Sequence, residues 1–110
     1  MKKTSLQKQW QTEIEKIKNQ LIFAYKPEKI ILYGSSALGK THEASDIDLV
    51  IIKNTSKNFY DRIGEVSGLV EHNVPIDFLV YTPFEFTKMA RESWFIKKEV
   101  VGKGQIIYGS

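Results

Sequence analysis

One short stretch of this chain carries residues that could bind a phosphate group and a metal ion together. Between Ile31 and Ile52, two apolar runs enclose a Gly-Ser pair and two aspartates separated by one residue. Gly34 and Ser35 interrupt a β-branched segment, where a backbone without a Cβ can turn sharply and present its N–H groups to an anion. Asp46 and Asp48 begin the second run, and the two-residue period of a strand would place both carboxylates on one face.

A third carboxylate could complete a metal site. Asp77 lies near the start of another strand-like run, VPIDFLVY, which we expect to form a neighbouring strand. Like charges at this spacing repel each other unless a cation lies between them. Oxygen ligands without cysteine or a convergent histidine favour a hard ion, Mg²⁺ or Mn²⁺, over zinc. The expected metal ligands are therefore Asp46, Asp48 and Asp77.

The motif resembles the signature of the DNA polymerase β-like nucleotidyltransferase superfamily and, more narrowly, a minimal nucleotidyltransferase. The resemblance extends to Asp77 and to the terminal GQIIYG, and covers most of the chain from Lys29 onward. It departs at Leu38, where many relatives carry an arginine that contacts the triphosphate. The family pattern, Gly-Ser-x-Ala-x-Gly and then Ser-Asp-x-Asp-Leu, is met by Gly34, Ser35, Ala37, Gly39, Ser45, Asp46, Asp48 and Leu49.

This resemblance implies both a fold and a reaction. The fold would be α/β (α+β), with a small mixed β-sheet flanked by helices, as in polymerase β-like nucleotidyltransferases. The reaction would transfer a nucleoside monophosphate to a hydroxyl with the help of two Mg²⁺ ions. The catalytic residues carried over from the family are Asp46, Asp48 and Asp77. The expected nucleotide-binding residues are Gly34, Ser35, Ser36, Lys40 and Ser45, the last mainly orienting the start of the strand.

The acceptor is suggested by the resemblance alone. The spacing of the motif and the short chain resemble the antitoxin of HEPN/minimal nucleotidyltransferase toxin–antitoxin systems. This implies transfer of AMP from ATP to a tyrosine of a cognate HEPN toxin. Two alternatives stay open. The first is a small-molecule nucleotidyltransferase of the aminoglycoside-modifying kind, with a homo-oligomer supplying the acceptor pocket. The second is a catalytically weak binding module that neutralises its partner by occlusion. Leu38 in place of arginine motivates the second alternative.

Composition limits the classes of protein to consider. The 110 residues predict a single minimal nucleotidyltransferase domain over residues 1–110, without room for a separate substrate domain. No apolar run approaches a membrane span, and the basic, amphipathic N-terminus does not resemble a secretory signal, so we expect a cytoplasmic protein without membrane contact. The absence of cysteine excludes disulfides and thiol chemistry. The net charge of +3 is spread along the chain, and we expect no specific nucleic-acid binding.

The elements that position the motif follow from apolar periodicity and capping signals. Apolar residues at steps of three and four predict an N-terminal helix over residues 4–25. A catalytic core is expected over residues 29–81, with strands at 29–33 and 46–53 and a third strand from about Pro75.

Two helices are expected inside or just after this core. The first begins at residue 36, and the second is capped by Ser56 or Thr55. A capping box at Thr82-Pro83-Phe84-Glu85 starts the C-terminal helices and tail, residues 83–110. Within this part we expect a helical segment over 92–101 and a short strand or tail over 105–108.

Overall fold

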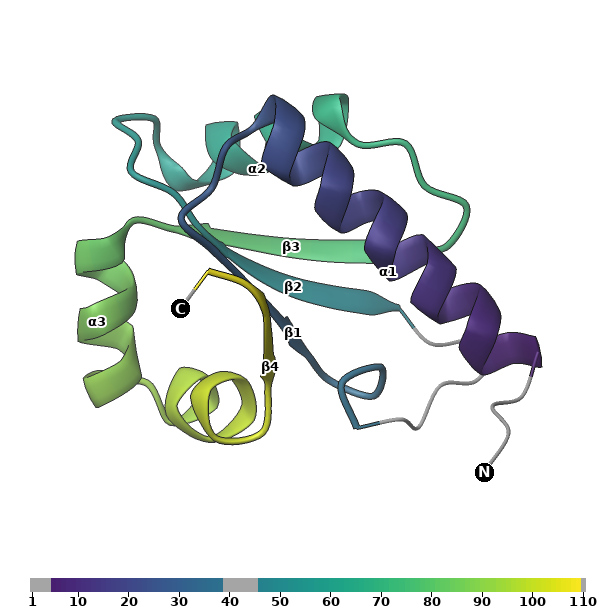
Figure 1. Cartoon of the computed structure of the whole chain (residues 1–110). Helices are drawn as coiled ribbons and strands as arrows, with labels where there is room; N and C mark the ends of the chain where they lie inside the picture. The colour runs from purple at the N-terminus through teal and green to yellow at the C-terminus, as the bar shows by residue number, and fades with distance from the viewer. Residues whose placement is uncertain (1–4, 39–45, 110) are drawn as a thin grey trace.

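The structure is a computed structural model that describes residues 5–38 and 46–109. The predictions for Gly39, Lys40 and Ser45 therefore lie outside the described residues. Helices and strands are interspersed along the chain (Figure 1). In chain order the elements are α1 (Ser5–Ala24), β1 (Lys29–Tyr33), β2 (Ile47–Ile52), α2 (Phe59–Leu69), β3 (Ile76–Tyr81), α3 (Pro83–Glu92), η1 (Ile96–Gly102) and β4 (Gln105–Tyr108).

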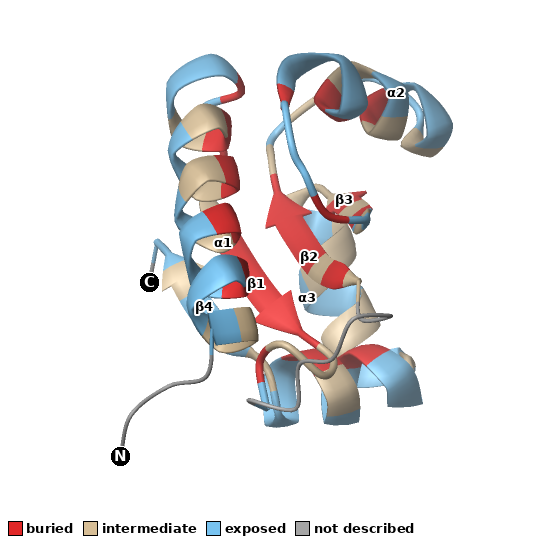
Figure 2. Ribbon diagram, turned by 90° about the vertical axis from the view of Figure 1, so that its right-hand side faces the viewer, coloured by how far each residue is buried: buried red, intermediate tan, exposed pale blue. Residues whose placement is uncertain are grey.

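The strands form one mixed sheet with the order β3-β2-β1-β4. Strands β2 and β3 are parallel, whereas β1 is antiparallel to both of its neighbours, β2 and β4. The two central strands, β1 and β2, are almost entirely buried (Figure 2). This arrangement confirms the expected small mixed sheet flanked by helices.

Each face of the sheet packs against a different pair of helices. On one face, alternate strand residues such as Ile30 and Leu49 join a cluster that contains Ile17 of α1 and Val66 of α2. On the other face, the intervening residues join a smaller cluster with Ile96 and Val100 of η1 and with apolar residues of α3. Because successive side chains of a strand point to opposite faces, the apolar residues of the central strands divide between these two layers.

Helix α1 carries a buried stripe as predicted, with one polar member. Trp10, Ile17 and Leu21 are buried, while Ala24, the last residue of the helix, is exposed. Glu13 is also buried and accepts hydrogen bonds from the backbone N–H (2.8 Å) and side-chain amide (3.3 Å) of Asn73. These bonds join α1 to the turn that precedes β3.

The C-terminal half shows one prediction confirmed and one corrected. The capping box is present: Thr82 Oγ1 accepts from the Glu85 backbone N–H, and the Glu85 carboxylate accepts from the Thr82 backbone N–H. Helix α2, in contrast, is capped by Asn58, whose side chain accepts from the Asp61 backbone N–H at 2.9 Å, and not by Ser56 or Thr55. Asparagine is among the strongest N-cap residues, and it lies closer to the apolar stripe.

Two predicted helices differ from the elements found. Residues 35–38 form hydrogen-bonded turns instead of the start of a helix. The segment expected as a helix over 92–101 is a π-helix, η1, which begins four residues later, at Ile96. The predicted last strand is confirmed as β4. No helix within residues 5–38 and 46–109 combines the length and apolar character needed to cross a membrane.

Candidate functional site

The register of the sheet brings two of the predicted acidic residues into one row. Asp48, the second residue of β2, lies opposite Asp77, the second residue of β3. On its other side Asp48 lies opposite Tyr33, the last residue of β1. Tyr33 faces the α3–η1 layer, and directly opposed residues share a face, so the row Asp77–Asp48–Tyr33 lies on that same face.

Asp46 completes a cluster of three carboxylates. It precedes the first residue of β2, and one carboxylate oxygen from each of Asp46, Asp48 and Asp77 lies within 4.8 Å of the other two. Asp46 and Asp48 are partly buried, whereas Asp77 is exposed. The sequence-based expectation that these acids lie close together is therefore confirmed, and the cluster is open to solvent on the Asp77 side.

The carboxylates strongly influence one another. Burial, together with the charges of Asp77 and Asp46, raises the pKa of Asp48 to about 6. Burial and the charges of Asp48 and Asp77 likewise raise the pKa of Tyr33. Among the ion pairs formed by described residues, none involves these three carboxylates. The cluster is thus a concentration of negative charge to which a divalent cation would be strongly attracted.

The donor set fits a hard divalent ion. Three carboxylate oxygens at this spacing, with no sulfur or imidazole among them, match the ligands that Mg²⁺ and Mn²⁺ prefer. Asp46, Asp48 and Asp77 are the residues that could hold such an ion. A bound divalent ion would offset most of their negative charge and would act as a Lewis acid on a phosphate oxygen.

The Gly-Ser turn lies directly against this cluster. Gly34 has φ of 76°, in the left-handed region, and a Cβ at this position would collide with Oδ2 of Asp48. The backbone conformation therefore favours glycine here, and a side chain at this position would also displace the Asp48 carboxylate. The Ser36 hydroxyl donates to the backbone oxygen of Asp46 at 3.4 Å and so joins the turn to the start of β2. Gly34, Ser35 and Ser36 are partly exposed, beside the acids.

Three residues that the sequence reasoning did not single out also adjoin the turn. Tyr33 precedes it on β1, and the ring of Phe95 packs edge-to-face on the Tyr33 ring, with centroids 5.6 Å apart and planes at 85°. Gln105 of β4 donates from Nε2 to the backbone oxygen of Ala37 at 2.7 Å. Tyr33 could have been considered because it borders the motif, but Phe95 and Gln105 have no local sequence signal.

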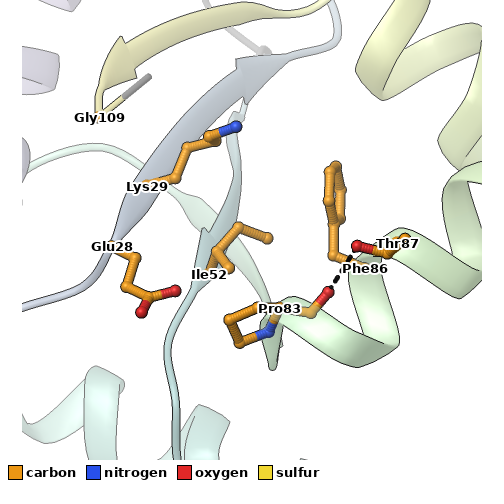
Figure 3. Close-up of a pocket in the computed structure, with 7 residues that line it drawn as sticks. All are labelled: Glu28, Lys29, Ile52, Pro83, Phe86, Thr87 and Gly109. Carbon is orange, nitrogen blue, oxygen red and sulfur yellow. Dashed lines mark hydrogen bonds between the residues drawn. The ribbon is translucent and has the colours of Figure 1, made fainter.

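A separate cavity lies at the opposite end of the same sheet face. It has a volume of about 400 Å³ and lies between the start of β1, the end of β2 and the first turns of α3 (Figure 3). None of the carboxylates of the cluster lines it. Its lining residues are Glu28, Lys29, Ile52, Pro83, Phe86, Thr87 and Gly109.

Comparisons with known proteins agree with the fold and the motif. No curated protein matches the chain. The solved structure of a candidate nucleotidyltransferase from Sulfolobus solfataricus aligns with a TM-score of 0.56 at 20% sequence identity, and covers 94% of this chain and 80% of the other. At that identity the likeness supports the fold. The family model described as a nucleotidyltransferase domain matches residues 14–107, which is most of the sequence. The chain therefore belongs to the nucleotidyltransferase domain family.

Proposed function

We propose that this chain transfers a nucleoside monophosphate from a nucleoside triphosphate to a hydroxyl group, with divalent metal ions held by Asp46, Asp48 and Asp77. The observation that carries the proposal is the cluster of three carboxylate oxygens within 4.8 Å of one another, directly beside the Gly34 turn. Membership of the nucleotidyltransferase domain family supports the same reaction class.

In the proposed reaction the acceptor oxygen forms a bond to the α-phosphorus. The bond from that phosphorus to the bridging oxygen breaks, and pyrophosphate leaves with the electron pair. The backbone N–H groups around Gly34 and Ser35 would bind the β- and γ-phosphates, as such turns bind anions elsewhere. Asp77, the most exposed of the three acids, would receive or orient the proton of the attacking hydroxyl. Positioning and charge neutralisation would supply most of the acceleration.

For the acceptor we propose a hydroxyl of a partner protein, with ATP as the donor and the tyrosine of a cognate HEPN toxin as the target. The support for this step is the motif spacing Gly34-Ser35, ten residues, Asp46-x-Asp48, which resembles that of antitoxin nucleotidyltransferases. In this proposal the chain is an antitoxin that inactivates its partner by modifying it.

One observation favours a second candidate function, neutralisation by occlusion. Leu38 occupies the position at which many relatives carry a triphosphate-binding arginine, and this residue of the turn is 48% exposed. An exposed apolar residue at the rim of the site would suit contact with a protein surface better than contact with a triphosphate.

The substitution Asp46→Asn separates these functions. The purified chain would be incubated with Mg²⁺, α-labelled ATP and the protein encoded by the adjacent gene, and labelling and neutralisation would both be measured. We expect the partner to be labelled by the wild-type chain and by the exposed control variant Glu71→Gln, and not by Asp46→Asn, which should also fail to neutralise. Neutralisation that persists in Asp46→Asn without labelling would replace the enzymatic proposal with occlusion. Label that appears only on a small molecule would overturn the protein acceptor.

A further inference from the structure

We propose that the C-terminal segment positions the turn that holds the nucleotide, through Phe95 on one side and Gln105 on the other. The turn is defined here as residues 34–38. The inference rests on the proposed function, because the turn matters for catalysis only if it binds the triphosphate. It assigns Phe95 and Gln105 as positioning residues, which act through Tyr33 and Ala37 without contact with the reacting atoms.

The first contact, between Phe95 and Tyr33, fixes the residue that directly precedes the turn. Tyr33 is only 9% exposed, and its ring is held edge-to-face by Phe95, the residue that precedes η1. Edge-to-face pairs of this kind are favourable beyond the area they bury. Gly34 follows Tyr33 directly and lies against Oδ2 of Asp48. Holding the Tyr33 ring therefore sets where the turn begins relative to the carboxylates.

The second contact fixes the far side of the turn. The Gln105 amide donates to the Ala37 oxygen at 2.7 Å across 68 residues of sequence. The residue before it, Gly104, lies between η1 and β1, so close to both that a Cβ there would collide with the Val100 backbone oxygen of η1 and crowd the Ile31 side chain of β1. This close approach brings the start of β4 beside β1, where the Gln105 side chain can reach the turn.

The backbone hydrogen bonds described within the turn are long. Its own hydrogen bonds, from the backbone N–H of Ala37 to Gly34 and of Leu38 to Ser35, are both 3.2 Å long, and the Ser36 bond to Asp46 is 3.4 Å long. These lengths lie at or beyond the upper end of the usual range, whereas the Gln105 bond is short. The short Gln105 bond and the Phe95 ring contact therefore help to fix where the backbone N–H groups of the turn lie.

The test compares each proposed positioning residue with a matched control elsewhere in the chain. Phe95→Ala is paired with Phe86→Ala, since Phe86 packs on the same apolar layer but lines the cavity at the opposite end of the sheet face. Gln105→Met is paired with Gln20→Met, since the Gln20 amide also donates to a backbone oxygen at 2.7 Å, that of Glu71. The measurements are Mg²⁺–ATP affinity by calorimetry and amide hydrogen exchange in the turn.

We expect Phe95→Ala and Gln105→Met each to weaken Mg²⁺–ATP binding about tenfold, because small misplacements of binding groups are costly. Exchange of the Ala37 and Leu38 amides should also accelerate. The control variants should change neither the Mg²⁺–ATP affinity nor the amide exchange of the turn, even where they lower the urea midpoint as much as Phe95→Ala or Gln105→Met does. Phe95→Tyr should keep both the affinity and the exchange rate at their wild-type values.

Two results would overturn the inference: turn amides that exchange at the wild-type rate in Phe95→Ala and Gln105→Met, or controls that weaken Mg²⁺–ATP binding to the same degree. A wild-type chain that does not bind Mg²⁺–ATP would instead overturn the proposed function with ATP as donor. In that case the exchange comparison still decides whether Phe95 and Gln105 fix the turn.

Discussion

Replacing Asp48 by asparagine should stabilise the metal-free protein, and by more at high pH than at low pH. The pKa of Asp48 is raised from 3.8 to about 6 in the folded chain, so the folded state binds more protons than the unfolded state between these values. Stability is therefore greatest below the unfolded pKa and falls as the pH rises through about 6. At 1.36 kcal/mol for each unit of pKa, the difference between 3.8 and about 6 corresponds to a loss of about 3 kcal/mol of folding stability at pH 8.

Part of the stability loss caused by ionised Asp48 is already present at pH 5. The same two pKa values give a cost of roughly 1.6 kcal/mol at pH 5, which leaves roughly 1.4 kcal/mol to develop between pH 5 and pH 8. Because Asp48 is partly exposed, these values are upper bounds. The stability advantage of Asp48→Asn over the wild-type chain should therefore grow by about 1 kcal/mol across this pH interval.

The assay is urea unfolding of both proteins at pH 5 and pH 8 with a chelator present. For Glu71→Gln, which removes an exposed acid outside the cluster, the stability difference from the wild-type chain should not grow between pH 5 and pH 8. Saturating Mg²⁺ should make the wild-type chain more stable than Asp48→Asn at pH 8, because Mg²⁺ binding to the native state stabilises the wild-type chain. The reasoning is refuted if the advantage of Asp48→Asn is the same at both pH values, or if the variant is less stable than the wild-type chain in chelator at pH 8.

Three further predictions concern other parts of the structure. Gly34→Ala should lower the free energy of unfolding in urea by about 1–2 kcal/mol, because alanine disfavours the left-handed backbone at this position. The variant should also abolish Mg²⁺–ATP binding, because the new Cβ collides with a site carboxylate. Arg62→Ala should lower the free energy of unfolding by about 2–3 kcal/mol in urea, because it removes a buried guanidinium paired with Glu85 at 2.6 Å. A loss of less than about 1 kcal/mol would contradict this prediction. Although burial raises the pKa of Glu13, hydrogen bonds from Asn73 and Lys16 and the charge of Lys16 lower it overall, so Glu13 contributes stability above pH 4.5 that is lost as the pH falls through its folded pKa. Glu13→Gln should therefore reduce the acid dependence of the urea midpoint, and an unchanged pH profile would argue against the role given to these bonds.

The parts of the fold that could be predicted from sequence are those set by neighbouring residues. The Thr82–Glu85 capping box depends on a four-residue pattern, and the structure contains it as expected. Strand β1 and the start of β3 were also predicted correctly, because continuous apolar runs and Pro75 mark them. The proximity of the three acids followed from the strand period and from placing Asp77 on a neighbouring strand.

The parts that could not be predicted depend on tertiary packing. Residues 96–102 were expected as part of an ordinary helix, but in the structure they form a π-helix that contacts β1 and α3. The contacts of Phe95 with Tyr33 and of Gln105 with Ala37 join positions more than 60 residues apart, and no spacing rule reveals such pairs. The sequence therefore indicated the carboxylates and the glycine turn, but not the segment that packs around them.

The most direct test of the central claim is a crystal structure of the chain with Mn²⁺ and a non-hydrolysable ATP analogue, with the metal located by its anomalous signal. We predict a metal peak at about 2.0–2.3 Å from oxygens of Asp46, Asp48 and Asp77, as expected for a hard divalent ion, with the nucleotide phosphates against the turn at Gly34 and Ser35. An anomalous peak elsewhere on the molecule, or carboxylates that point apart with the nucleotide bound away from them, would contradict the proposed site.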